Sequence, residues 1–258
     1  MEVKKRYTVL TYIFNGYERV HEVGEKDPEA EYVLITDDPG LKSETWRVVY
    51  DPMPRYSAFA KCYTVRFHPF NYADTPIIVR VDGSIGINKS LKPIVDEFER
   101  GKYDRCLMIH PHRNTLPSEY DVWVKTRNYP AAQAAKCMVA LKRMGYDLMQ
   151  EGLYQGCFEV LRNNRVNNDI NDLTFGLLCL MGTNSIERID QTITSAIINR
   201  FYSNLEVLPV SEDIITDGDL MTWYFHNSNM PIPLKTDTIP PVLFGKPATM
   251  ISKIRKGK

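Results

Sequence analysis

The chain has 258 residues, 43% of them hydrophobic, and its 32 lysines and arginines balance 32 aspartates and glutamates, so the net charge is zero. This length suits one large α/β domain with a sizeable core, and the charge balance excludes an overall positive field for binding nucleic acid. The five cysteines lack the spacing of zinc sites, and their odd number argues against a secreted disulfide framework. We therefore expect most of them to be small core residues in a reducing compartment.

Runs of β-branched and aromatic residues in the first third of the chain predict four short strands, at 7–14, 32–36, 46–50 and 77–81, and a helix is expected at 56–67. Short strands separated by connections and helices are typical of a mostly parallel sheet. The first run contains threonine and tyrosine and has no small-residue cleavage site, so it reads as a strand and not as a signal peptide.

The rest of the chain continues the alternation of strands and helices. Apolar residues at helical spacing predict helices at 91–101, 130–144, 170–181 and 193–201, and strands are expected at 105–109 and 157–161. Frequent prolines predict irregular structure from Pro209 onward. We find no linker, so we expect one domain over 1–235 and an irregular basic tail over 236–258.

No run reaches the ~18 apolar residues that a membrane-spanning helix needs. We therefore expect a cytoplasmic protein. The basic tail at 253–258 would allow at most a peripheral contact with the inner membrane.

The segment Asp82-Gly83-Ser84 lies between two apolar runs, "IIVRV" and "IGI". Asp-Gly in this setting is typical of a two-residue hairpin turn. The alternative is an acid at the carboxyl end of a parallel strand, where open α/β sheets bind their ligands. Residues 15–17 and 37–38 follow two other predicted strands and would share that cleft. Glycine-rich dinucleotide and P-loop motifs do not occur in the sequence.

Two segments, "SAFAKCYTVRFHPF" (57–70) and "VRVDGSI" (79–85), resemble a helix and the following strand of GT-A type glycosyltransferases. They most resemble the glycosyltransferase-like family named for plant turgor-regulation and mucilage-related proteins, which has bacterial members. Three later segments resemble that family in the same order, and the resemblance spans about 55–200: "MIHPHRNTLPSE" (108–119), "GLYQGCFEVLRNN" (152–164) and "NDLTFGLLCLMGTNSIERIDQTITSAI" (171–197).

The resemblance implies a single GT-A-like domain with a mostly parallel mixed sheet flanked by helices. It also implies a glycosyltransferase with a nucleotide-sugar donor, a glycan or lipid-linked acceptor and often Mn²⁺ or Mg²⁺ on an Asp-x-Asp motif. Here the second acid is replaced by Ser84, and one carboxylate with a hydroxyl is a weak site for a hard dication. Asp82 with His226 is the candidate metal pair, and a metal-independent mechanism is left open.

The resemblance, together with the positions of Tyr17 and Asp38 after predicted strands, assigns candidate roles. Asp190 and Gln191 would act catalytically beneath the sugar, although Asp190 also reads as a helix N-cap. The candidates for donor binding are Tyr17, Asp38, Lys61, Asp82, Gly83, Ser84, His110 and Arg113. Two other functions are left open: a catalytically degenerate module that binds nucleotide sugars or glycans, and a glycosidase with Asp82 and Asp190 as its acid pair.

Overall fold

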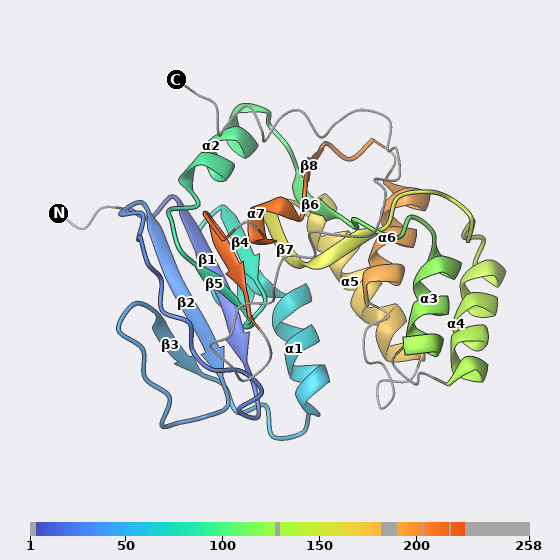
Figure 1. Ribbon diagram of the computed structural model, residues 1–258, viewed down its shortest axis with the longest axis horizontal. Helices are drawn as coiled ribbons and strands as arrows, with labels where there is room; N and C mark the ends of the chain where they lie inside the picture. Colours follow the sequence, from blue (N-terminus) through green and yellow to red (C-terminus); the bar gives the residue numbers. More distant parts are fainter. Residues whose placement is uncertain (1–3, 127–129, 182–189, 203, 217, 225–258) are drawn as a thin grey trace.

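The computed structural model describes residues 4–126, 130–181, 190–202, 204–216 and 218–224. Within these ranges the protein is an α/β fold built on a seven-stranded, mostly parallel mixed sheet with the strand order β3-β2-β1-β4-β7-β6-β8, and helices flank the sheet (Figure 1). The strands are β1 (Tyr7–Ile13), β2 (Ala30–Thr36), β3 (Arg47–Tyr50), β4 (Ile77–Val81), β6 (Arg105–Ile109), β7 (Tyr154–Arg162) and β8 (Val207–Val210); β5 (Ile85–Ile87) and β9 (Met221–Trp223) form a second, two-stranded sheet.

Six strands of the large sheet run in one direction. Strands β1 to β4 are parallel to their neighbours, β6 shares their direction because both β4 and β6 are antiparallel to β7, and β8 is parallel to β6. The carboxyl ends of these six strands and the beginning of β7 therefore share one edge, which we call the carboxyl edge. From β1 the chain builds outward to β2 and β3, then returns to add β4 on the other side of β1. The point between β1 and β4 is the topological switch point, where open α/β sheets bind ligands.

Helices cover the two faces of the sheet differently. Helix α2 (Lys92–Arg100) packs on one face together with the small sheet, in a cluster that includes Val79, Phe98 and Phe158. The other face carries two separate apolar clusters, one around β1 and β2 and one under the remaining long helices. Those helices are α1 (Ala58–Phe67), α3 (Leu116–Thr126), α4 (Ala131–Arg143), α5 (Arg165–Met181) and α6 (Asp190–Phe201), of which α3 to α6 stand together at the right of Figure 1.

The expected α/β class, all six expected strands and all five expected helices are confirmed, with shifts of a few residues at their ends. The expectation of irregular structure from Pro209 onward is wrong for the described part of that region, which holds β8, a short helix α7 (Asp213–Thr216) and β9. Proline is tolerated in β8 because this strand lies at the edge of the sheet and pairs only with β6. The tail at 236–258 lies outside the described residues.

The hairpin alternative for Asp82-Gly83 is also wrong. The segment does form a turn, in which the Ile85 amide donates to the carbonyl of Asp82 at 3.0 Å. However, β4 pairs with β1 and β7, whereas β5 pairs with β9. The turn therefore carries the chain out of the large sheet, and Asp82 stands at the end of a central strand.

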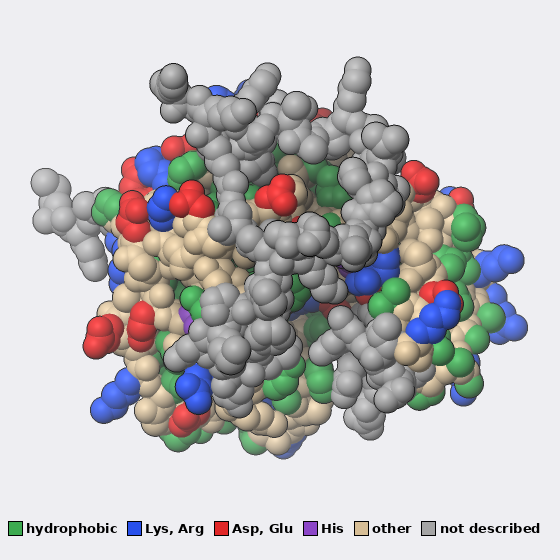
Figure 2. Space-filling model, in the orientation of Figure 1, with side chains coloured by type: hydrophobic (Ala, Val, Ile, Leu, Met, Phe, Trp, Pro, Cys, Tyr) green, Lys and Arg blue, Asp and Glu red, His purple; other side chains and the backbone are tan. Residues whose placement is uncertain are grey.

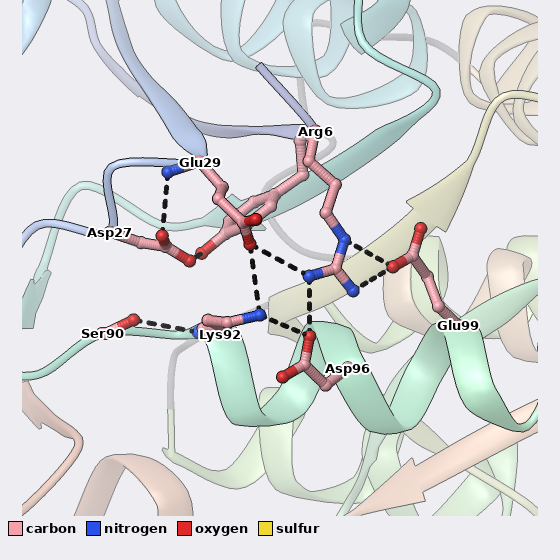
Figure 3. A network of polar contacts seen from close by, with 8 residues as sticks. Arg6, Asp27, Glu29, Ser90, Lys92, Asp96 and Glu99 are labelled. Atoms are coloured by element: carbon pink, nitrogen blue, oxygen red, sulfur yellow. Dashed lines mark hydrogen bonds and ion pairs between the residues drawn. The ribbon is translucent and has the colours of Figure 1, made fainter. Parts of the chain in front are cut away.

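An ion cluster at the opposite edge of the sheet fastens the start of β1 to α2, and we call it the amino-edge cluster (Figure 3). The Arg6 guanidinium contacts Glu99, Asp96 at 2.7 Å and Glu29 at 3.2 Å. Lys92 bridges Glu29 and Asp96 at 3.1 and 2.9 Å. Because five charges interact at once, the cluster holds its geometry better than an isolated surface pair does.

On the face seen in Figure 2, the described side chains of both charge signs are interspersed, in keeping with the net charge of zero. None of the five cysteines is in a disulfide; Cys106, Cys137 and Cys157 are buried as expected, whereas Cys179 is exposed. No helix in the described ranges is long and apolar enough to cross a membrane.

The amino-edge cluster generates a salt-dependent stability prediction. We expect Arg6→Gln to lower the free energy of unfolding by about 1 kcal/mol at low salt, because several partly screened pairs are lost together. The loss should shrink in 1 M NaCl, where charges are screened within about 3 Å. Urea unfolding at both salt concentrations measures it.

Arg47→Gln is the matched control, because Arg47 makes a single exposed pair with Glu31. We expect its effect to stay within a few tenths of a kcal/mol. Equal losses for the two variants, or a loss for Arg6→Gln that salt leaves unchanged, would contradict the assigned role of the cluster.

Candidate functional site

Asp82 lies at the carboxyl end of β4, at the switch point between β1 and β4. Its carboxylate oxygen Oδ1 accepts from Nη1 of Arg80 at 3.0 Å and, more weakly, from the Tyr12 hydroxyl at 3.4 Å. Its side chain is 36% exposed, whereas that of Arg80 is completely buried. Among the described residues no hydrogen bond falls on Oδ2. Asp82 is therefore held from inside the protein and keeps one oxygen for a ligand.

Gly83 brings the chain close to the end of β1. A Cβ at this position would lie 3.0 Å from the Tyr12 carbonyl oxygen and 3.2 Å from Cγ1 of Ile13. A larger residue would push β4 and β1 apart at the switch point. Glycine is thus required here by close packing, and the sequence-based expectation that it admits a diphosphate or ribose remains a prediction.

Arg80 belongs to a buried ion network that crosses the centre of the sheet. Its guanidinium contacts Glu159 of β7 at 3.4 Å and donates to the Gly156 carbonyl at 2.6 Å. Glu159 also pairs with Arg105 of β6, whose Nη2 donates to Oδ1 of Asn171 at 2.8 Å. Burial raises the pKa of Glu159, but Arg105 and Arg80 outweigh it, so the pKa lies below its ordinary value.

A second buried pair joins this network from the helices. Arg66 of α1 forms an ion pair with Asp190, the first residue of α6, and both side chains are buried. Burial lowers the pKa of Arg66, but the charges of Asp190, Asp82 and Glu159 outweigh this and raise it. Three arginines thus face three carboxylates, and we call this set the central ion network: Arg66, Arg80, Arg105, Asp82, Glu159 and Asp190.

Strand register explains why the network divides the apolar side of this face. One row of opposed residues crosses five strands and reads Val33, Leu10, Arg80, Glu159, Leu107. The two charged residues therefore separate the cluster that contains Leu10 from the cluster that contains Leu107. In addition, the register between β6 and β7 shifts, so residues 156–158 have no opposite residue in β6. Such bulges redirect backbone groups, and here the Gly156 and Cys157 carbonyls bind Arg80 and the Asp82 amide.

Lys61 and Asp37 form a separate ion pair at the carboxyl edge, beside the switch point. Nζ of Lys61 is 2.7 Å from Oδ2 of Asp37, and the Asn15 amide donates to Oδ1 at 2.8 Å. Burial raises the pKa of Asp37, but these contacts outweigh it and the pKa falls below its ordinary value. Lys61 was expected to reach a phosphate, and its charge is balanced by Asp37, which was expected to line the same cleft.

His110 and Arg113 lie together after β6, as their spacing suggested. Nη2 of Arg113 contacts Nε2 of His110, and Nε of Arg113 pairs with Glu119, a buried residue of α3. Nε2 of His110 is 3.8 Å from the same carboxylate. The charge of Arg113 is thus balanced by Glu119, and Arg113 is more exposed than His110.

The remaining sequence candidates are loop residues, buried or half-buried residues, and one residue outside the described ranges. Tyr17 is exposed beyond β1, and the Asp38 carboxylate closes a local turn by accepting from the Gly40 amide at 2.8 Å. Ser84 is buried, and Gln191 is half-buried on α6 with an Oε1 that has no partner in the described part of the chain. His226 lies outside the described residues.

Two acids at the carboxyl edge were not predicted from the sequence. Glu18 is buried, and its Cγ lies 3.4 Å from where a Cβ of residue 83 would be. Glu212 follows β8 and accepts from Nε2 of Gln155 at 3.3 Å. No motif marks either residue, and only the expectation of a strand at 207–210 would have brought Glu212 to this edge.

The described donor set does not fit a divalent cation. No group of three or more His, Cys, Asp or Glu side chains in the described ranges is arranged to hold a metal ion. The best single ligand, Asp82, already has a guanidinium at 3.0 Å from one oxygen, and Ser84 is buried. We therefore derive no chemical step through a metal.

No protein-family model matches this chain, and no curated protein matches it either. The function of the site is therefore inferred from its geometry and from the segments that carry the resemblance.

The central ion network generates a stability prediction. We expect Glu159→Gln to lower the free energy of unfolding by about 3–5 kcal/mol, because two buried guanidinium groups lose a shared carboxylate. The pKa of Glu159 is lowered by folding, so its contribution is present above the pKa of the unfolded state and is lost as pH falls through the folded value. The difference between variant and wild type should hold near neutral pH and shrink below about pH 4.

Glu97→Gln is the matched control, because Glu97 is also a buried glutamate but pairs with an exposed arginine, Arg100. We expect it to cost at most about 1 kcal/mol. Urea unfolding across pH compares them, and a Glu159→Gln cost as small as the control would rule out a central role for the network.

Proposed function

We propose that the protein is a GT-A type glycosyltransferase that transfers a sugar from a nucleotide-diphosphate sugar to a glycan or lipid-linked acceptor, in cell-surface polysaccharide synthesis. One observation carries the proposal. Four of the segments that resemble the family each contribute a charge to the same buried network: Arg66 from 57–70, Arg80 and Asp82 from 79–85, Glu159 from 152–164 and Asp190 from 171–197. Segments far apart in sequence that meet around one group support a shared site.

The position of Asp82 supports a nucleotide-binding role. It ends β4 at the switch point, where α/β sheets bind ligands, and its charge reaches the surface there. Oδ2 of Asp82 would accept from a ribose or sugar hydroxyl of the donor. The close approach of Gly83 to β1 would hold the Asp82 carboxylate in a fixed position.

The reaction is displacement at the anomeric carbon through an oxocarbenium-like state, and its main electrostatic demand is the charge on the departing diphosphate. Because the described donor set does not fit a dication, we assign this task to the chain's own cations. Arg113 and Lys61 are the candidates at the carboxyl edge, each already aligned by a carboxylate partner. His110 would act through its contact with Arg113.

Asp190 fits a different role from the one that the resemblance implies. A buried Asp190 paired with Arg66 favours positioning, since Arg66 also feels the charge of Asp82. In this proposal Asp190 fixes Arg66, and Arg66 helps to fix Asp82.

The alternative function is a catalytically degenerate module that binds nucleotide sugars. It is favoured by the same observation that disfavours a metal site, namely a single carboxylate at the end of β4. Binding of a nucleotide sugar without its hydrolysis would support this alternative.

The test uses UDP-, GDP- and CDP-linked hexoses, each with and without manganese, and measures thermal stabilisation and release of nucleoside diphosphate. We expect at least one donor to stabilise the protein and to be slowly hydrolysed. Asp82→Asn should weaken donor binding about 10- to 100-fold, because a charged hydrogen bond contributes about 1.5–3 kcal/mol. It should also cost stability, since Arg80 loses a partner, so binding is measured well below the melting temperature.

Asp96→Asn is the matched control, because Asp96 is likewise a partly exposed aspartate on an arginine but belongs to the amino-edge cluster. It should lose some stability and keep donor binding. No stabilisation by any donor would exclude both nucleotide-dependent functions, and donor binding that survives Asp82→Asn unchanged would remove Asp82 from the site.

A further inference from the structure

Glu212 is a titratable group at the carboxyl edge that has no part in the proposed donor site. It lies two residues beyond the end of β8, at the start of α7, and its side chain is half-buried. Since β8 is parallel to β6 and β6 to β4, the ends of β8 and β4 lie on the same edge. Glu212 thus lies on the same edge as Asp82, with β7 and β6 between their strands.

Gln155, at the beginning of β7, orients this carboxyl. Its Nε2 donates to Oε1 of Glu212 at 3.3 Å. The Gln155 side chain is more than nine-tenths buried, yet its Oε1 has no hydrogen-bond partner within the described ranges. A buried amide oxygen without a partner is costly, and it suits a ligand that brings a hydroxyl donor.

The surroundings of the Glu212 carboxyl favour its protonated form. Burial raises its pKa, and this outweighs the opposing effects of Gln155, His112 and Arg113, while the neighbouring Asp213 adds to the rise. A base whose pKa approaches the working pH is a better catalyst than one that is always ionised.

Cys157 links this carboxyl to the donor site. Burial raises the pKa of its thiol, and the charges of Asp82 and Glu212 raise it further, so both carboxylates act on one side chain of β7. Two acids held in different environments can divide the work, so that one binds and the other moves a proton.

We propose that Glu212 is the general base of the transfer reaction, with Gln155 as its positioning residue; this rests on the proposed glycosyltransferase function. The acceptor hydroxyl gives its proton to Glu212 while its oxygen bonds to the anomeric carbon. The bond between that carbon and the diphosphate oxygen breaks, and its electron pair leaves with the diphosphate. Because the acceptor attacks opposite the leaving group, the product has inverted anomeric configuration.

The test uses donor hydrolysis, in which water replaces the acceptor hydroxyl, with whichever of the UDP-, GDP- or CDP-hexoses the wild type cleaves. Glu212→Gln should lower kcat by 100-fold or more, in the range for loss of a general base, and leave donor-induced thermal stabilisation unchanged. The wild-type rate should fall at acid pH with a midpoint above 4.5, the ordinary value for glutamate, and the variant should lack this limb.

Asp213→Asn is the matched control, an exposed acid one residue further on. It should keep the rate near neutral pH and retain the acid limb, with the midpoint moved slightly down because Asp213 adds to the raised pKa of Glu212. Glu212→Asp retains a carboxyl and should recover part of the rate, which separates loss of the base from loss of the fold. Gln155→Leu should move the acid limb, because it changes the hydrogen bond on the carboxyl.

The outcomes distinguish the two proposals. If the wild type binds and cleaves a donor, and Glu212→Gln cleaves it at the same rate with the same pH profile, the assignment of the base is wrong and the proposed function stands. Release of a hexose with the same anomeric configuration as its donor, observed before mutarotation, would also overturn it, because it shows retention. If no donor binds or is cleaved, the proposed function itself fails.

Discussion

Three arginines and three carboxylates share the interior of one face of the sheet, and this balance of buried charge is the constraint on which the rest of the fold depends. A buried ion that loses its partner costs several kcal/mol, about 3–5 by the measure of other proteins. The elements that carry these ions, α1, β4, β6, β7 and α6, are therefore fixed relative to one another more strictly than apolar packing alone would require. The bulge in β7 belongs to the same arrangement, since the carbonyl of Gly156 accepts from Arg80.

The network also accounts for the character of the candidate site. Of the three carboxylates in the network, Asp82 is the one that is partly exposed, and it lies at the topological switch point between β1 and β4. Its geometry is set from beneath by a completely buried arginine, so it needs no loop to hold it. A binding group on a rigid strand end is better preorganised than one on a loop. The positions of Lys61 and Arg113 at the carboxyl edge are likewise each fixed by an ion pair with a carboxylate.

Local patterns in the sequence correctly predicted the strands that contain runs of β-branched residues, namely β1, β2, β3, β4, β6 and β7. They also predicted the helices that have a clear apolar stripe. They failed where tertiary context decides: β8 contains Pro209, which only an edge position tolerates. Arg80 stands within the apolar run "IIVRV" and signalled that a partner must exist, but Glu159 becomes that partner only through antiparallel register. Asp82 was found because its turn is visible in the sequence. Glu212 was not predicted, because no pattern in the neighbouring sequence indicates that β8 brings it to the carboxyl edge.

The central claim is that the switch point, with Asp82 at its base, is the nucleotide-binding site. A crystal structure of the protein with a bound nucleoside diphosphate, chosen as the one that most raises the melting temperature, tests it most directly. The account predicts the nucleotide between the carboxyl ends of β1 and β4, with a ribose hydroxyl within hydrogen-bonding distance of Oδ2 of Asp82 or a diphosphate oxygen within that distance of the Gly83 amide. A nucleotide bound at the amino edge, or one on the carboxyl edge with Asp82 uncontacted, would contradict it.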